Sequence, residues 1–147
     1  MEVIHRQAKG LNEVPLARTF LNAVQNYLLV LNAQRQIVMA SENVLELTPG
    51  KTMDQIVGLR PGEALGCIYA HDCASGCGTS EFCRQCGTVK VILAGLAGSR
   101  CMQECNLTRV AEGRQETLQL LVLGTPLVHN QERFTLLAIS NITHEKQ

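Results

Sequence analysis

Tryptophan is absent from the sequence, and aromatic residues make up only 3% of its 147 residues. Proteins that bind single-stranded nucleic acids stack the bases on aromatic side chains, so this chain has little material for that function. It also lacks a net charge, because 13 basic residues balance 13 acidic ones. Nothing in the charge would steer the protein to nucleic acid or to an anionic membrane, and we expect neither partner.

Long apolar runs are missing as well. The longest ones, such as Leu118–Leu123, fall far short of the roughly 20 residues that a membrane-spanning helix needs. Residues 1–9 carry charges, whereas a secretory signal has an apolar stretch at this place. We therefore predict a cytoplasmic protein. With 46% apolar residues, a chain of this length suits one domain with one core.

Cysteine, in contrast, is abundant. The sequence has seven cysteines, an odd number in a chain without a recognisable signal peptide, which argues against a disulfide framework. We expect reduced thiols, whose chemistry is then the main clue to function.

The first half of the chain predicts a helix, a hairpin and several short helices. Apolar residues at helical spacing predict an amphipathic helix over residues 14–24. Two apolar runs at 27–31 and 36–40 are separated by polar residues, which predicts a hairpin. The stretch 41–66 is interrupted by two Pro-Gly turn signals and predicts brief helices.

The second half predicts one long helix and three strands. Apolar residues that recur at steps of four and three predict a helix over 80–96, namely Phe82, Cys86, Val89, Leu93 and Leu96. The segments 101–110, 117–128 and 133–142 are apolar or alternating and predict antiparallel strands. The predicted fold class is α+β, a five-stranded antiparallel sheet with helices packed on one face. We predict a single domain over residues 1–147, with an N-terminal extension at 1–13 and the start of a C-terminal connector at 143–147.

This order of elements resembles the PAS family over residues 14–147. The segment 27–41 resembles the opening PAS hairpin, and 134–146 resembles the last strand with its Asp-Ile-Thr exit, here with Asn141 in place of Asp. The segment 60–87 resembles a cysteine-bearing PAS subgroup associated with bacterial sensor histidine kinases. The resemblance implies a sensory domain without catalytic residues, a homodimer, and an effector such as a histidine kinase.

Four cysteines predict a metal centre: Cys67, Cys77, Cys83 and Cys86. On a helix, the last two are neighbours at positions i and i+3, with Cβ atoms about 5–6 Å apart, close enough to chelate one ion through Zn–S bonds of about 2.3 Å. Glycines at 76, 78 and 87 flank the thiols and let the backbone fold closely around a buried centre.

Other possible ligands are less favoured. Cys105 alternates with Leu107 on one strand face and is a possible additional ligand, whereas His71 and Cys73 lie in a polar stretch and are weak candidates. Free cysteine is also a common buried residue, and this simpler interpretation is favoured for Cys101. Four thiolates suit both zinc and an iron-sulfur cluster, so the sequence leaves the identity of the centre open.

Three functions compete. The leading hypothesis is a sensor whose cysteine-bound centre responds to redox state, oxygen or metal. The main alternative is a PAS module for dimerisation or small-ligand binding with a purely structural zinc site. A thiol-disulfide oxidoreductase that uses Cys83 and Cys86 is disfavoured, because that motif belongs with parallel strands and this sequence predicts antiparallel ones. We therefore predict that the domain is not an enzyme.

Overall fold

The computed structural model describes residues 2–14, 16–48, 50–67, 87–111 and 113–143. Its helices are α1 (Glu2–Asn12), α2 (Ala17–Ala23), the 3-10 helix η1 (Glu42–Leu47), α3 (Met53–Ile56), α4 (Pro61–Leu65) and α6 (Gly87–Leu96). Its strands are β1 (Tyr27–Leu31), β2 (Ile37–Ala40), β3 (Cys101–Ala111), β4 (Arg114–His129) and β5 (Glu132–Asn141).

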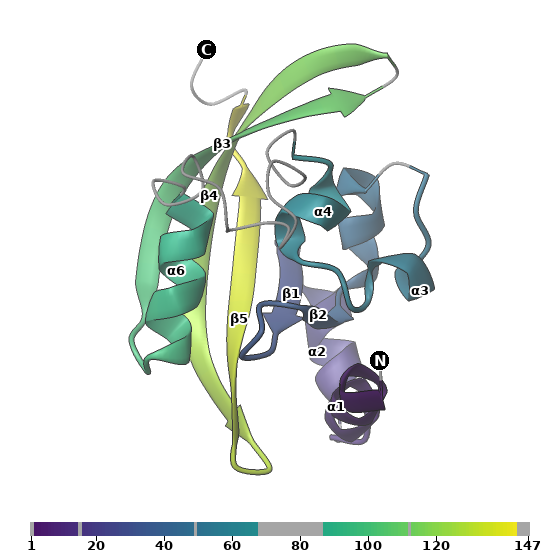
Figure 1. Cartoon of the computed structure of the whole chain (residues 1–147), viewed down its shortest axis with the longest axis vertical. Helices are drawn as coiled ribbons and strands as arrows, with labels where there is room; N and C mark the ends of the chain where they lie inside the picture. Colours follow the sequence, from purple (N-terminus) through teal and green to yellow (C-terminus); the bar gives the residue numbers. More distant parts are fainter. Residues whose placement is uncertain (1, 15, 49, 68–86, 112, 144–147) are drawn as a thin grey trace.

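The strands form one five-stranded sheet in the order β2-β1-β5-β4-β3, with every neighbouring pair antiparallel. The first and last strands of the chain, β1 and β5, are therefore neighbours in the middle of the sheet (Figure 1). The predicted fold class is confirmed, and the predicted strand positions agree with the observed ones to within a few residues at each end.

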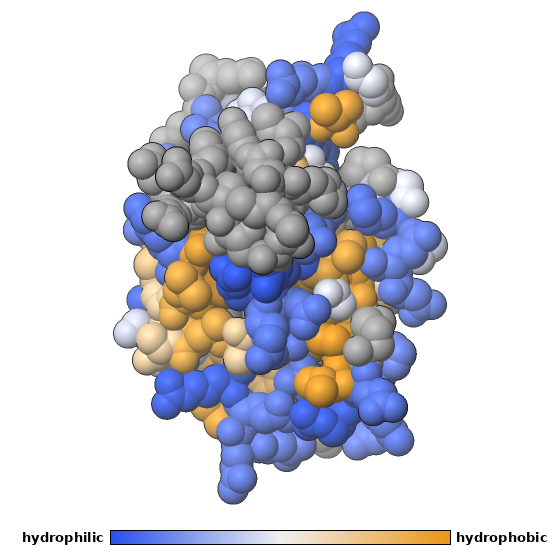
Figure 2. Space-filling view, viewed as in Figure 1, coloured by the Kyte–Doolittle hydropathy of each residue, from blue (hydrophilic) through white to orange (hydrophobic). Residues whose placement is uncertain are grey.

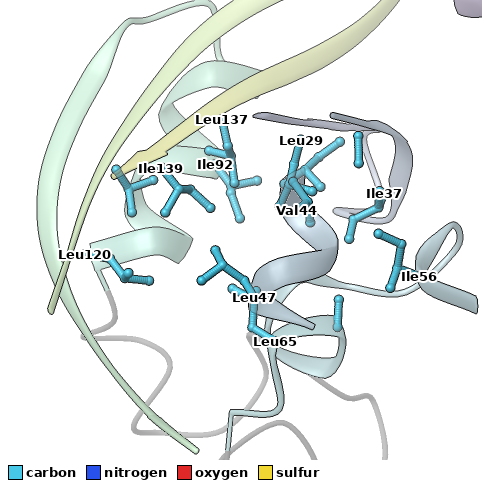
Figure 3. Close-up of a cluster of buried hydrophobic side chains, with 14 of the residues drawn as sticks. Leu29, Ile37, Val44, Leu47, Ile56, Leu65, Ile92, Leu120, Leu137 and Ile139 are labelled. Atoms are coloured by element: carbon cyan, nitrogen blue, oxygen red, sulfur yellow. The ribbon is translucent and has the colours of Figure 1, made fainter. Parts of the chain in front are cut away.

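One face of the sheet, here called the inner face, is covered by η1, α3, α4 and α6. Helix α6 lies across β3, β4 and β5. Figure 3 shows that the side chains of Leu29 and Leu137 from the sheet and of Leu47 from η1 point into a common core. Burial of such apolar surface is the main term that stabilises the fold.

The opposite, outer face is covered by α1 and α2. Because side chains alternate along a strand, Leu28, Val30 and Phe134 point away from the inner core and pack in a second cluster with Ile4 and Leu11. The expectation that helices pack on one face thus describes only the elements from η1 onward. Helix α1 occupies most of the predicted N-terminal extension at 1–13, for which the sequence predicted no helix.

The buried face of α6 contains part of the apolar spacing that predicted the helix. Val89 is buried, but Leu93 is 51% exposed, and Val91 and Ile92 are buried in addition. Apolar side chains accordingly gather on the molecular surface over α6 (Figure 2). Two glycines allow α6 to pack closely on the sheet. A Cβ at Gly95 would lie 2.5 Å from Thr135 Oγ1 of β5, and a Cβ at Gly124 of β4 would lie 3.0 Å from the Val91 carbonyl oxygen.

Candidate functional site

The first cysteine of the predicted metal centre is held at the end of α4. Gly66 ends this helix in the left-handed conformation, with φ of 81°, which glycine adopts at little cost. The Cys67 amide donates a hydrogen bond to the Gly62 carbonyl at 2.8 Å. Cys67 then forms an isolated antiparallel bridge with Arg109 of β3 and packs, half-buried, against the inner core. Its backbone is therefore fixed against the sheet.

Arg109 is a buried charged residue that sequence reasoning missed. Its Nη1 donates to the Leu47 carbonyl at 2.6 Å and its Nε donates to Glu116 Oε1 at 2.8 Å. The Arg109 side chain is 9% exposed, while that of Glu116 is 43% exposed. Arg109 thus joins β3, η1 and the Cys67 backbone. The available signal was a basic residue at a position that alternates inward with Cys105 and Leu107 along β3.

Two further cysteines lie on the inner side of β3. Cys101 and Cys105 are half-buried and pack against the inner core, and Cys105 shares a face with Leu107 as the alternation predicts. Cys105 is four residues from Arg109, the bridge partner of Cys67. At a rise of about 3.3 Å per residue, this separates Cys105 from the bridge by about 13 Å along the strand.

The remaining predicted ligands, Cys77, Cys83 and Cys86 together with the weak candidates His71 and Cys73, lie outside the described residues. Helix α6 begins at Gly87, directly after the last of these cysteines in the sequence. Among the residues that the structure describes, no group of three or more His, Cys, Asp or Glu side chains could hold a metal ion. The four-cysteine set stays a prediction.

The end of β5 is fastened to β4 by a short network of hydrogen bonds. The Ile142 amide donates to the Gln119 carbonyl at 2.8 Å, and the Gln119 amide donates to Thr143 Oγ1 at 3.0 Å. Asn141 Oδ1 accepts from the Thr143 amide at 3.1 Å and from its hydroxyl at 2.6 Å. Asn141 therefore serves as an acceptor in a tight turn, a role for which an Asn oxygen is as suitable as that of Asp.

Comparison with known proteins gives structural matches only. No family model matches the sequence, and neither does any curated protein. Within the described residues, no helix has the length and apolar character needed to span a membrane.

Several solved structures have a similar fold. A PAS domain from Colwellia psychrerythraea aligns with a TM-score of 0.58 and 14% identity, over 97% of this chain and 98% of that one. A PAS domain from a two-component sensor histidine kinase aligns with a TM-score of 0.53 and 13% identity, over 88% and 96% of the two chains. The light-state structure of the blue-light photoreceptor Aureochrome1 LOV aligns with a TM-score of 0.53 and 20% identity, over 89% and 91%.

Proposed function

The chain has the PAS fold, and from this premise we propose that it is the sensory domain of a signalling protein and not itself an enzyme. The similar structures include a domain of a sensor histidine kinase and a blue-light photoreceptor, so one fold serves different signals and the signal must be argued from the site. The observation that carries our proposal is the position of Cys67, held by α4 and by the bridge to Arg109 against the inner face.

The proposed signal is redox state, oxygen or metal, and the proposed sensor is a metal centre, either an iron-sulfur cluster or zinc. Its ligands are Cys67, Cys77, Cys83 and Cys86. The first of these cysteines follows α4 and the last precedes α6, so both ends of the cysteine segment are joined to elements that pack on the inner face. We leave Cys105 outside the ligand set, because about 13 Å of backbone along β3 separates it from the Cys67 bridge, more than two cysteine side chains and two Zn–S bonds of about 2.3 Å can span around one ion.

The test is anaerobic reconstitution with iron and with zinc, followed by absorption spectroscopy and elemental analysis. We expect about one centre per chain, because four thiolates complete the coordination of one zinc ion or one cluster. A Cys83→Ser variant should lose the centre and melt at a lower temperature, since a metal bound only by the folded state stabilises it. The matched control, Cys101→Ser, should keep both. Well under one metal per chain after both reconstitutions contradicts the centre.

The proposed output is a change at the end of β5 that passes to an effector such as a histidine kinase, with the domain acting as a homodimer. Hydrogen exchange should show different protection of residues 134–143 in the metal-loaded and metal-free forms, because α6 packs on β5. If residues 134–143 are equally protected in both forms, the metal has a purely structural role and does not signal through β5. Light scattering checks the dimer, and the domain should show no catalytic reduction of insulin disulfides.

A further inference from the structure

The outer face of the sheet carries an apolar groove that the proposed metal centre does not use. Its volume is about 430 Å³, and it lies between the α1–α2 region and strands β1, β4 and β5. Its lining includes Val14, Phe20, Leu21, Val30, Leu127 and Leu136. Pockets of roughly 300–1,000 Å³ with mainly apolar walls and a few polar groups are typical of sites for small molecules.

A polar hollow of about 310 Å³ adjoins this groove between α1 and the β4–β5 turn. His129 lines both hollows, and its Nε2 is buried with no hydrogen-bond partner in the part of the chain that the structure describes. Helix α1 passes directly over it, since a Cβ at Gly10 would lie 3.7 Å from Nε2. Buried polar atoms are almost always hydrogen-bonded, so we expect a polar atom of a ligand to form a hydrogen bond with this nitrogen.

The polar hollow is lined by charges of both signs and offers two hydrogen-bond donors to a ligand. Arg6 is already paired with Glu132, Nη1 to Oε1 at 2.6 Å, and Gln7 Nε2 donates to the other oxygen of that carboxylate at 2.8 Å. Lys9 and Glu13, one turn apart on α1, also line the hollow. The Lys9 ammonium and a His129 N–H can both donate to a carboxylate, while Glu13 opposes it.

We propose that this composite site binds a single-chain carboxylic acid, with its alkyl chain in the apolar groove and its carboxylate between His129 and Lys9. A second copy of the protein suits the groove less well. A flat apolar surface would cover the exposed side chains of Phe20 and Val128, but it would leave His129 Nε2 without a partner. The site lies on the opposite face of the sheet from Cys67 and extends the proposed function to a second input.

Calorimetric titration of the full chain with dodecanoate, below its micelle concentration, tests the proposal. We expect saturable binding of one molecule per chain, and at least tenfold weaker binding of dodecyltrimethylammonium, which has the same tail and the opposite charge. His129→Leu and Lys9→Gln should each weaken dodecanoate binding, the first by at least about tenfold, the lower end of what a lost charge-assisted hydrogen bond costs. Glu13→Gln changes an exposed side chain, removes the charge that opposes the carboxylate, and should strengthen binding.

Val110→Ala, at an exposed apolar residue of β3, is the matched control and should leave binding unchanged. Cys83→Ser should also bind dodecanoate normally, so failure of the metal centre and failure of this site are distinguishable. Absence of saturable binding, equal binding of the cationic detergent, or unchanged affinity in a folded His129→Leu protein each overturns the proposal. A dimer that does not bind dodecanoate and dissociates on Phe20→Ala overturns it too, and identifies the groove as an interface between copies.

Discussion

Replacement of Arg109 by methionine tests whether the Arg109 side chain joins β3 to η1 next to the Cys67 bridge. The substitution keeps an unbranched side chain on β3 but removes the hydrogen bond from Nη1 to the Leu47 carbonyl and the pair with Glu116. Loss of a hydrogen bond from a buried charged donor costs about 1.5–3 kcal/mol. The half-exposed pair with Glu116 adds at most about 1 kcal/mol, because solvent screens it. We therefore expect a fall of about 2–4 kcal/mol in the free energy of unfolding, measured by urea denaturation.

Glu116→Gln is the matched control, because it weakens only the exposed half of the Arg109 interactions. It should cost about 1 kcal/mol or less. If Arg109→Met destabilises the protein no more than Glu116→Gln, the buried hydrogen bond to the Leu47 carbonyl does not contribute to stability, and the inference that the Arg109 side chain joins β3 to η1 is wrong. The denaturant slope should be the same in both variants, since neither substitution changes the surface exposed on unfolding.

Two further predictions concern the packing of each face. Gly124→Ala should destabilise the fold by about 1–3 kcal/mol in urea denaturation, because its Cβ would collide with Val91 of α6. Gly10→Ala, in α1, should be neutral or stabilising, because its Cβ would lie 3.7 Å from the nearest atom. Hydrogen bonds from Arg6 and Gln7 lower the pKa of Glu132. Its ionised form therefore stabilises the fold at pH values above the ordinary carboxyl pKa of about 4.3. This stabilisation is lost as the pH falls through the lower pKa that Glu132 has in the folded protein. Melting curves between pH 3 and 7 should therefore show a smaller loss of stability on acidification for Glu132→Gln than for the unmodified protein, and equal acid sensitivity would contradict the assignment.

The sheet could be predicted from sequence because its strands carry strong local signals. The apolar run at Tyr27–Leu31 is β1 as observed, and the polar loop after it turns the chain into β2. These strands are buried on both faces, so their side chains form near-continuous apolar runs that are easy to recognise. Order along the chain then favoured a PAS-like arrangement.

Helix α1 could not be predicted in the same way, because a polar residue interrupts its inward face. Gln7 lies between Ile4 and Leu11 and is only 6% exposed. Its burial depends on partners distant in sequence, since Asn32 Nδ2 donates to Gln7 Oε1 at 2.9 Å and Gln7 Nε2 donates to Glu132 Oε2 at 2.8 Å. No window of neighbouring residues contains those partners.

The inward face of α6 and the burial of Arg109 illustrate the same limit. Helix α6 is apolar around most of its circumference, so spacing alone could not choose between Leu93 and Ile92. Gly95 and Gly124 determine which side of the helix is buried, because the lack of a Cβ at these positions lets that side of α6 approach β4 and β5 closely. The buried guanidinium of Arg109 donates a hydrogen bond to the Leu47 carbonyl of η1, and these two residues are far apart in the chain. The cysteine set was predicted from spacing, and its geometry depends on residues outside the described part of the chain.

Strand β5 contacts both α6, the helix that follows the cysteine segment, and the apolar groove. On the inner face, Thr135 Oγ1 donates to the Ile92 carbonyl of α6 at 3.0 Å, and on the outer face the next residue, Leu136, lines the apolar groove. The same strand ends in the Asn141 turn that is fastened to β4. A ligand can shift β5 only if it binds one arrangement of the strand better than another. If both the metal centre and the carboxylic acid do so, each must change the affinity of the other by the same factor, because equilibrium coupling between two sites is reciprocal.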